Sequence, residues 1–260
     1  LLPCLRALIE LVANYGCSVV LCTATQPAFN GMLGRKGFAV REIAPAPSEL
    51  FKKLKRVSYR FDGVLGDDDL AARLADRDQS LCIVNSRKQA RRLHELLDGE
   101  DSYHLTTLMH PVHRERVLNE IRQRLREGRT CRVVATSLIE AGVDVDFPVV
   151  YRALAGVDSM VQAAGRCNRE GRQSAEESIV HVFEPADDYA LPSDVAQKVA
   201  IARSVISEME GAACESCDIG ALEAIDAYFA RLYAVREGAL DASGVLRDLE
   251  GFSLKSLNIP

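Results

Sequence analysis

Short apolar runs alternate with segments of helical spacing through the middle of this 260-residue chain, and this alternation constrains the fold most strongly. Each run has the length and composition of a strand buried on both faces of a parallel sheet. Residues 85–97 and 111–127 lie between such runs and carry apolar side chains at helical spacing. Four or five strands separated by helices predict an α/β fold, with a parallel sheet covered by helices on both faces. The runs that favour strands are residues 80–84, 131–135, 149–151 and 178–183, with residues 57–61 and 103–105 as less regular candidates.

The segments before this alternation are less regular. Residues 1–14 have the apolar spacing of an amphipathic helix, and residues 19–22 form one more apolar run that we expect to be a strand. Glycines and prolines then predict a connector that ends at residue 56. Residues 62–69 are acidic and contain glycine, which favours a loop that leads into a helix over residues 70–75.

Cysteine usage and hydropathy limit the class of protein. Most of the eight cysteines lie inside apolar runs without the spacing of a disulfide framework, which predicts a reducing cytoplasm. Cys214 and Cys217 have metal-ligand spacing, but no second pair completes a four-ligand site, so we expect no metal. No run of about 18 apolar residues is present, so we expect no membrane span. The chain opens inside a helical pattern without methionine, and we expect it to be part of a longer protein.

The net charge of the chain is −5, and charged residues are distributed unevenly along the sequence. Residues 35–60 hold eight basic and two acidic side chains, and residues 114–132 hold seven arginines and three glutamates. Either segment could supply contacts to the phosphates of a nucleic acid, although solvated ion pairs on a helix would explain residues 114–132 equally well. From residue 184 onward fourteen acidic residues outnumber six basic ones. We therefore expect no direct contact between nucleic acid and this last part, whose helices are predicted over residues 193–209 and 219–236.

Polar residues follow three of the apolar runs at the point where each run ends. Because the carboxyl ends of parallel strands lie at one edge of a sheet, a ligand is expected there. Hydroxyl and amide groups suit contacts to a phosphate backbone, Asp144 could accept a hydrogen bond from a ribose hydroxyl, and Gly142 permits a tight backbone turn. The residues are Thr23 and Thr25 after the first run, Asn85, Ser86 and Arg87 after the second, and Thr136, Ser137, Glu140, Gly142 and Asp144 after the third.

Residues 162–169, which read QAAGRCNR, carry the strongest functional signal. Gln162, Arg166 and Arg169 are four and three residues apart, so on one helix they would project from a single face. We expect Asp158 or Ser159 to cap such a helix. Two guanidinium groups and an amide that converge suit a polyphosphate whose charge grows during cleavage. A surface helix with two solvated arginines is the alternative, which Gly165 disfavours because glycine destabilises a helix interior.

These segments, in this order, resemble the signature motifs of superfamily 2 helicases. Residues 23–25 (TAT) are similar to the third motif and residues 83–86 (IVNS) to the fourth. Residues 135–144 (ATSLIEAGVD) are similar to the fifth motif, and residues 162–171 (QAAGRCNREG) to the sixth. The residues of these last two motifs, together with TQP at residues 25–27, most resemble those of the CRISPR-associated helicase-nucleases of type I systems.

The resemblance implies a RecA-like second helicase lobe over residues 57–185. It further implies a C-terminal remnant of the first lobe over residues 1–28, a connector over residues 29–56 and a helical C-terminal segment over residues 186–260. The function implied is ATP-dependent translocation on single-stranded DNA in antiviral defence, in the cytoplasm of a prokaryote. The implied partners are single-stranded DNA, a guide-RNA surveillance complex, and an N-terminal nuclease and first helicase lobe.

The resemblance also implies a role for each candidate residue. Arg166 and Arg169 would be catalytic arginine fingers, and Gln162, Gly142 and Asp144 would bind the nucleotide. DNA-backbone contacts would come from Ser86, Arg87, Thr136 and Ser137, and coupling between lobes from Thr23 and Thr25. The full-length protein would bind ATP and Mg²⁺.

Three parts of such an enzyme have no counterpart in this sequence. There is no Gly-x-x-x-x-Gly-Lys-Ser/Thr loop, no Asp-Glu pair before Thr23 to hold Mg²⁺, and no His-Asp dipeptide typical of the nuclease. We therefore expect this chain alone to bind no ATP and to have no ATPase activity. A repair or restriction translocase of superfamily 2, and a non-catalytic lobe that binds nucleic acid or a partner protein, remain alternatives.

Overall fold

The computed structural model of the chain describes residues 2–13, 15–23, 25, 41–140, 142–211, 218–236 and 240–250. The chain forms two compact units, one comprising Leu1–Pro47 with Ile225–Pro260 and the other comprising Ser48–Ala224. The larger unit contains the sheet and all of the motifs that follow the connector. The domain boundaries implied by the resemblance remain predictions.

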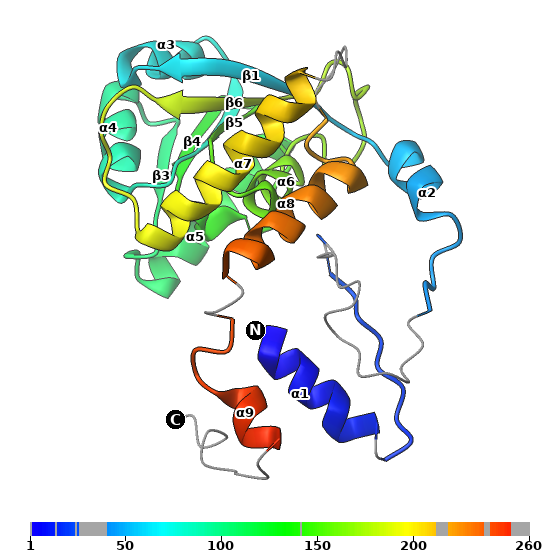
Figure 1. Cartoon of the computed structure of the whole chain (residues 1–260). Helices are drawn as coiled ribbons and strands as arrows, with labels where there is room; N and C mark the ends of the chain where they lie inside the picture. Colours follow the sequence, from blue (N-terminus) through cyan, green and yellow to red (C-terminus); the bar gives the residue numbers. More distant parts are fainter. Residues whose placement is uncertain are drawn as a thin grey trace. The chain divides into compact units, whose positions relative to one another are not determined.

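The larger unit is built on a parallel sheet with the strand order β1-β6-β5-β2-β4-β3 (Figure 1). Its strands are β1 (Ser58–Leu65), β2 (Gln79–Ile83), β3 (Ser102–Leu105), β4 (Cys131–Ala135), β5 (Val150–Ala153) and β6 (Ile179–Pro185). The helices between them are α3 (Asp67–Ala75), α4 (Arg87–Leu97), α5 (Pro111–Arg126) and α6 (Val157–Ala164). The runs after the connector that favoured strands therefore all lie in this sheet.

Alternate residues of the central strands face two separate hydrophobic cores. On one side, Cys82 packs with Leu70 of α3 and Leu93 of α4. On the other side, Leu81 packs with Ile121 of α5 and Ala163 of α6. Because both sides of β2 are covered, its residues from Ser80 to Ile83 are fully buried. The predicted α/β fold, with helices on both faces of a parallel sheet, is confirmed (Figure 1).

The loop predicted over residues 62–69 is wrong, because β1 continues to Leu65 and α3 begins at Asp67. Gly63 has φ +69°, a conformation that favours glycine, and lies where the pairing of β1 with β6 shifts between Phe61 and Val64. Asp62 stays in the strand because its carboxylate accepts hydrogen bonds from Arg73 and His181, at 2.8 and 2.9 Å. Tertiary pairing therefore overrides the local signal of an acidic turn.

The apolar run at residues 19–22 forms no strand. Residues 17–23 have no regular secondary structure, and Val20 is 68% exposed. A strand is stable only when neighbouring strands pair with its backbone groups, and within the described residues no strand pairs with this segment. The prediction of a strand here is wrong.

The remaining helices are α1 (Leu2–Ala13), α2 (Pro47–Lys53), α7 (Ser193–Gly211), α8 (Leu222–Arg236) and α9 (Val245–Glu250). The helices predicted over residues 1–14, 193–209 and 219–236 are confirmed, the last starting three residues later at Leu222. Asp218 explains the later start, because its carboxylate accepts from the Gly220 N–H at 3.0 Å and holds a turn there. Among the described residues, no helix has the length and apolarity needed to cross a membrane.

Candidate nucleotide and nucleic-acid site

Three neighbouring strands bring the candidate residues to the carboxyl edge of the sheet. Strand β2 lies between β5 and β4, and Ile83 pairs with Arg152 on one side and with Ala135 on the other. The segments that follow these strands therefore begin side by side. They contain residues 84–86, 136–140 and 154–156, and α6 follows the last of them.

Ser86 is the N-cap of α4. Its hydroxyl oxygen accepts a hydrogen bond from the Lys88 N–H at 3.2 Å, which explains why the helix begins at Arg87. The hydroxyl hydrogen is not used by this bond and could be donated to a phosphate oxygen. Arg87 is exposed at the first position of the helix. The N-cap of α4 is thus made by Ser86.

Thr136 follows β4 and has an unusual environment. The residue is 6% exposed, and its hydroxyl oxygen has no hydrogen-bond partner among the described residues. Its backbone N–H donates to the Leu105 carbonyl at 3.0 Å, so the residue is held in register with β3. Ser137 is exposed and starts a short 3-10 helix, Ser137–Ile139. A buried hydroxyl without a partner requires an explanation, and a ligand oxygen would provide one.

The helix predicted to carry Gln162, Arg166 and Arg169 ends too early to hold all three. Helix α6 ends at Ala164 with Gly165 as its C-cap, so only Gln162 lies on it. Beyond Gly165 the backbone pairs with Phe147 instead, whose N–H donates to the Arg166 carbonyl at 2.9 Å. The prediction of a single helical face is therefore wrong. Gly165, expected in the interior of the helix, instead marks its end.

The start of α6 also differs from the prediction. Its N-cap is Gly156, without a side-chain cap, and Asp158 and Ser159 lie in the first turn. The hydroxyl of Ser159 donates to the Glu140 carboxylate at 2.6 Å. This side chain therefore connects α6 with the segment after β4 rather than capping the helix.

Arg166 is buried beneath the segment that follows β4. The residue is 8% exposed, and its guanidinium donates from Nε to the Ile139 carbonyl at 3.0 Å and from Nη2 to the Glu140 carbonyl at 2.7 Å. Burial lowers the pKa of Arg166, and the nearby Arg169 cation lowers it further. In this conformation Arg166 connects the sixth motif with residues 139 and 140 of the fifth motif.

Arg169 has a different environment from Arg166. Its Nε atom lies 2.7 Å from the Asp144 carboxylate, and the two side chains are 41% and 77% exposed. Its backbone N–H donates to the Asp146 carboxylate at 2.7 Å, so the backbone is anchored while the guanidinium is accessible. Gly142 is exposed with φ +70°, as expected for a tight turn. Arg169, Asp144 and Gly142 therefore belong to one exposed region, next to the buried Arg166.

Sequence reasoning missed Arg152, the largest fully buried side chain in the described part of the chain. Its Nη2 atom lies 3.0 Å from the Glu140 carboxylate, and its Nη1 atom donates to the Asn85 side-chain carbonyl at 2.8 Å. The available signal was a single charged residue inside the apolar run that becomes β5. A charge in such a strand requires partners, and these lie in the segments that follow β2 and β4.

Other predicted residues lie away from this site or outside the described residues. Thr23 is exposed and Thr25 is buried in the smaller unit, and their coupling role stays a prediction. Cys214 and Cys217 and residues 29–40 of the connector lie outside the described residues. Within the described ranges, no three histidine, cysteine or acidic residues are grouped so that they could hold a metal ion.

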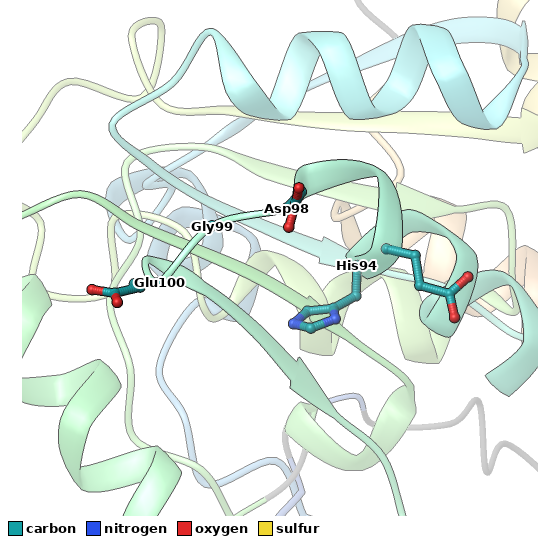
Figure 2. Close-up of a pocket in the computed structure, with 5 residues that line it drawn as sticks. His94, Asp98, Gly99 and Glu100 are labelled. Atoms are coloured by element: carbon teal, nitrogen blue, oxygen red, sulfur yellow. The ribbon is translucent and has the colours of Figure 1, made fainter.

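A pocket on the larger unit is remote from these motifs. It lies at the turn that joins α4 to β3, where Figure 2 shows His94, Asp98 and Glu100. The turn precedes β3, so it belongs to the amino edge of the parallel sheet, whereas the candidate residues follow strands at the carboxyl edge. We assign it no part in the candidate site.

The sequence of this chain is similar to that of known proteins. Residues 76–172 match the family model for the C-terminal part of the CRISPR-associated nuclease/helicase Cas3. The Cas3 of Methanothermobacter thermautotrophicus is 29% identical over 196 residues, which cover 69% of this chain and 24% of that protein. The chain thus spans about a quarter of this relative.

Solved structures show the same fold at lower identity. The T. fusca Cas3-ATP crystal structure aligns with a TM-score of 0.57 and 18% identity, covering 76% of this chain and 26% of that one. A chain of a CRISPR RNA-guided surveillance complex in a pre-nicking state aligns with a TM-score of 0.53 and 18% identity, covering 78% of this chain and 28% of that one. The sequence matches confirm the predicted resemblance, because this chain is similar to the C-terminal part of the CRISPR-associated nuclease/helicase Cas3, and the solved structures share its fold.

Proposed function

We propose that this chain supplies the second helicase lobe of an ATP-dependent translocase on single-stranded DNA in CRISPR antiviral defence. The observation that carries the proposal is the convergence of the segments after β2, β4 and β5 at one edge of the sheet, with the buried Thr136 hydroxyl lacking a partner there. In open α/β sheets this edge is where ligands bind. The relationship to the Cas3 family supports the assignment of the ligands.

The DNA backbone would be held by Ser86, Arg87, Thr136 and Ser137. Ser86 and Thr136 follow adjacent strands and each offer a hydroxyl hydrogen, while Arg87 and Ser137 are exposed beside them. Hydroxyl donors and one guanidinium suit phosphate oxygens, and such contacts carry no base specificity. Binding without sequence preference is what a translocase requires.

The nucleotide would be contacted by Gln162, Arg169, Gly142 and Asp144. The exposed guanidinium of Arg169 could leave Asp144 for a phosphate, because surface ion pairs contribute little free energy. Arg166 would act as a finger only after leaving the carbonyls of Ile139 and Glu140, since both bonds use its guanidinium here. ATP with Mg²⁺ supplies the phosphoryl group whose charge these cations would stabilise.

These residues fit one side of a triphosphate. The sequence contains no phosphate-binding Gly-x-x-x-x-Gly-Lys-Ser/Thr loop and no Asp-Glu pair before Thr23, so the opposite side would come from a first helicase lobe and a nuclease region of the same protein. A guide-RNA surveillance complex is the partner that we propose for the complete protein, supported by the structural similarity to a chain of such a complex. We place this activity in the prokaryotic cytoplasm.

A binding experiment with this chain tests the proposal. Fluorescence anisotropy of a labelled thymidine homopolymer would be measured at fixed salt, because phosphate contacts make affinity salt-dependent. We expect Thr136→Val to weaken binding by about threefold to tenfold, the effect of losing one hydrogen bond to a charged group. Thr130→Val is the matched control at the opposite end of β4 and is expected to bind as the wild type does. The proposal is wrong if the wild-type chain does not bind, or if both variants bind equally well.

A further inference from the structure

Arg152 places a cation at the centre of the sheet. Strand β5 lies between β6 and β2, and the Arg152 side chain is 2% exposed. A buried guanidinium is costly unless each of its N–H groups meets an acceptor, and apolar side chains of similar volume often stabilise a core as well or better. Stability alone therefore does not explain an arginine in this strand.

The partners of Arg152 come from three different segments. Nη1 donates to the Asn85 side-chain carbonyl at 2.8 Å, and Nη2 lies 3.0 Å from the Glu140 carboxylate and donates to the Ser159 hydroxyl at 3.0 Å. Ser159 in turn donates to Glu140 at 2.6 Å, and the Asn85 amide donates to the Leu154 carbonyl at 2.8 Å. One side chain is thus bonded to the segments that follow β2 and β4 and to the first turn of α6.

Each of these segments carries a residue of the proposed site. Asn85 precedes Ser86, Glu140 ends the segment that contains Thr136, and Ser159 is on the helix that contains Gln162. Fixed donor geometry distinguishes the planar guanidinium from a lysine ammonium, which would not hold three acceptors in one plane. The arrangement fixes the spacing between the hydroxyl groups proposed to contact DNA.

We propose that Arg152 is a positioning residue that sets the relative placement of the segments after β2 and β4 and of α6, so that the hydroxyl groups of Ser86 and Thr136 contact successive phosphates. This inference rests on the proposed function of the carboxyl edge in binding single-stranded DNA. It adds a residue that does not touch the ligand and that acts through Asn85, Glu140 and Ser159. Positioning groups have large effects because small misplacements weaken every contact of a site.

The test separates positioning from stability by removing both charges together. The double variant Arg152→Met with Glu140→Gln leaves no unpaired buried charge, so its thermal unfolding midpoint should exceed that of Arg152→Met alone. We expect the double variant to remain folded by circular dichroism and to bind the labelled thymidine homopolymer at least about tenfold more weakly than the wild type. The matched control, Arg73→Met with Asp62→Asn, also removes a bonded arginine–carboxylate pair and contacts none of the proposed DNA-binding residues. It should bind as the wild type does.

Wild-type affinity in the folded double variant would overturn the inference while leaving the proposed function intact. Absence of DNA binding by the wild-type chain would overturn both. If the double variant does not fold, Ser159→Ala and Asn85→Ala decide the question, because each removes one partner and keeps the Arg152–Glu140 pair. Weaker binding by both, with unfolding midpoints near that of the wild type, supports positioning, and wild-type binding by both overturns it.

Discussion

Asn168 donates a hydrogen bond from its side-chain amide to the backbone carbonyl of Arg56, at 2.9 Å. The two residues are 112 positions apart in the chain, and Arg56 immediately precedes the segment that enters β1. The guanidinium of Arg56 returns the contact by donating to the Arg169 carbonyl. The segment that precedes β1 and the segment that carries Arg169 are therefore joined by two hydrogen bonds, with one donor on each segment.

Asn168 makes these bonds from a left-handed backbone conformation. Its φ is +45°, and its side chain also bonds the backbone of Gln173 through both the amide and the carbonyl, at 2.7 and 3.1 Å. Asparagine is among the few residues that tolerate this region, because its side chain can bond locally. Such conformations persist where surrounding bonds hold them, and they occur often at functional sites.

We predict opposite effects of alanine and glycine at two asparagines. At Asn168, Ala should destabilise the fold by about 1 kcal/mol more than Gly, because both remove the side-chain bonds and only Ala strains the positive φ. At Asn119, on the exposed surface of α5, Gly should instead cost about 1 kcal/mol more than Ala, because glycine weakens a helix interior. Urea denaturation of the four variants measures both differences. Equal stability of the two Asn168 variants would show that the backbone there is unstrained.

We predict that the two arginines of the sixth motif differ in their effect on stability. Arg166→Ala removes the donors that reach the carbonyls of Ile139 and Glu140 and should destabilise the fold by about 2–4 kcal/mol. Arg169→Ala removes an exposed ion pair with Asp144 and should change stability by less than about 1 kcal/mol. The comparison uses denaturant midpoints of the two single variants. A loss for Arg169→Ala as large as that for Arg166→Ala contradicts the prediction.

The sheet could be predicted from the sequence because the composition of each short segment indicates its strand. Residues 81–84 are apolar throughout, and so short an apolar run between two helices favours a strand covered on both faces. The amphipathic helices and the N-cap at Ser86 are equally local. The residues at strand ends could be assigned to one edge because parallel strands share their direction.

The details that the sequence did not predict depend on contacts between distant residues. The helical spacing of Gln162, Arg166 and Arg169 continues past Gly165 in the sequence. Only the pairing of Phe147 with the backbone that follows shows that α6 ends there. The apolar run at residues 19–22 has strand composition, but composition does not supply a neighbouring strand. Arg152 was visible as a charge in an apolar run, yet its partners lie 67 residues before it at Asn85 and on two other segments.

We predict that His104 makes stability decrease as the pH falls below neutrality. Burial lowers the pKa of His104, and repulsion from His94 and Arg91 lowers it further, while its Nε2 atom has no hydrogen-bond partner among the described residues. The unfolded chain therefore takes up this proton more readily, near its ordinary pKa of about 6.5, so the stability that neutral His104 provides is present above that pH and is lost below it. Between pH 7 and pH 5, His104→Gln should lose less unfolding free energy than the wild type. Parallel pH profiles would contradict the assignment.

We predict that this chain alone does not hydrolyse ATP. Phosphoryl transfer requires a loop that cradles the β- and γ-phosphates and a carboxylate that holds Mg²⁺, and the sequence contains neither a Gly-x-x-x-x-Gly-Lys-Ser/Thr loop nor an Asp-Glu pair before Thr23. Arg169, which is exposed, and Gln162 of α6 would stabilise charge on a phosphate, but the sequence lacks the loop that would position that phosphate. Phosphate release should stay at the buffer background with and without single-stranded DNA, and Arg169→Ala should leave that background unchanged. DNA-stimulated turnover that Arg169→Ala abolishes would show instead that the chain builds a complete nucleotide site from other residues.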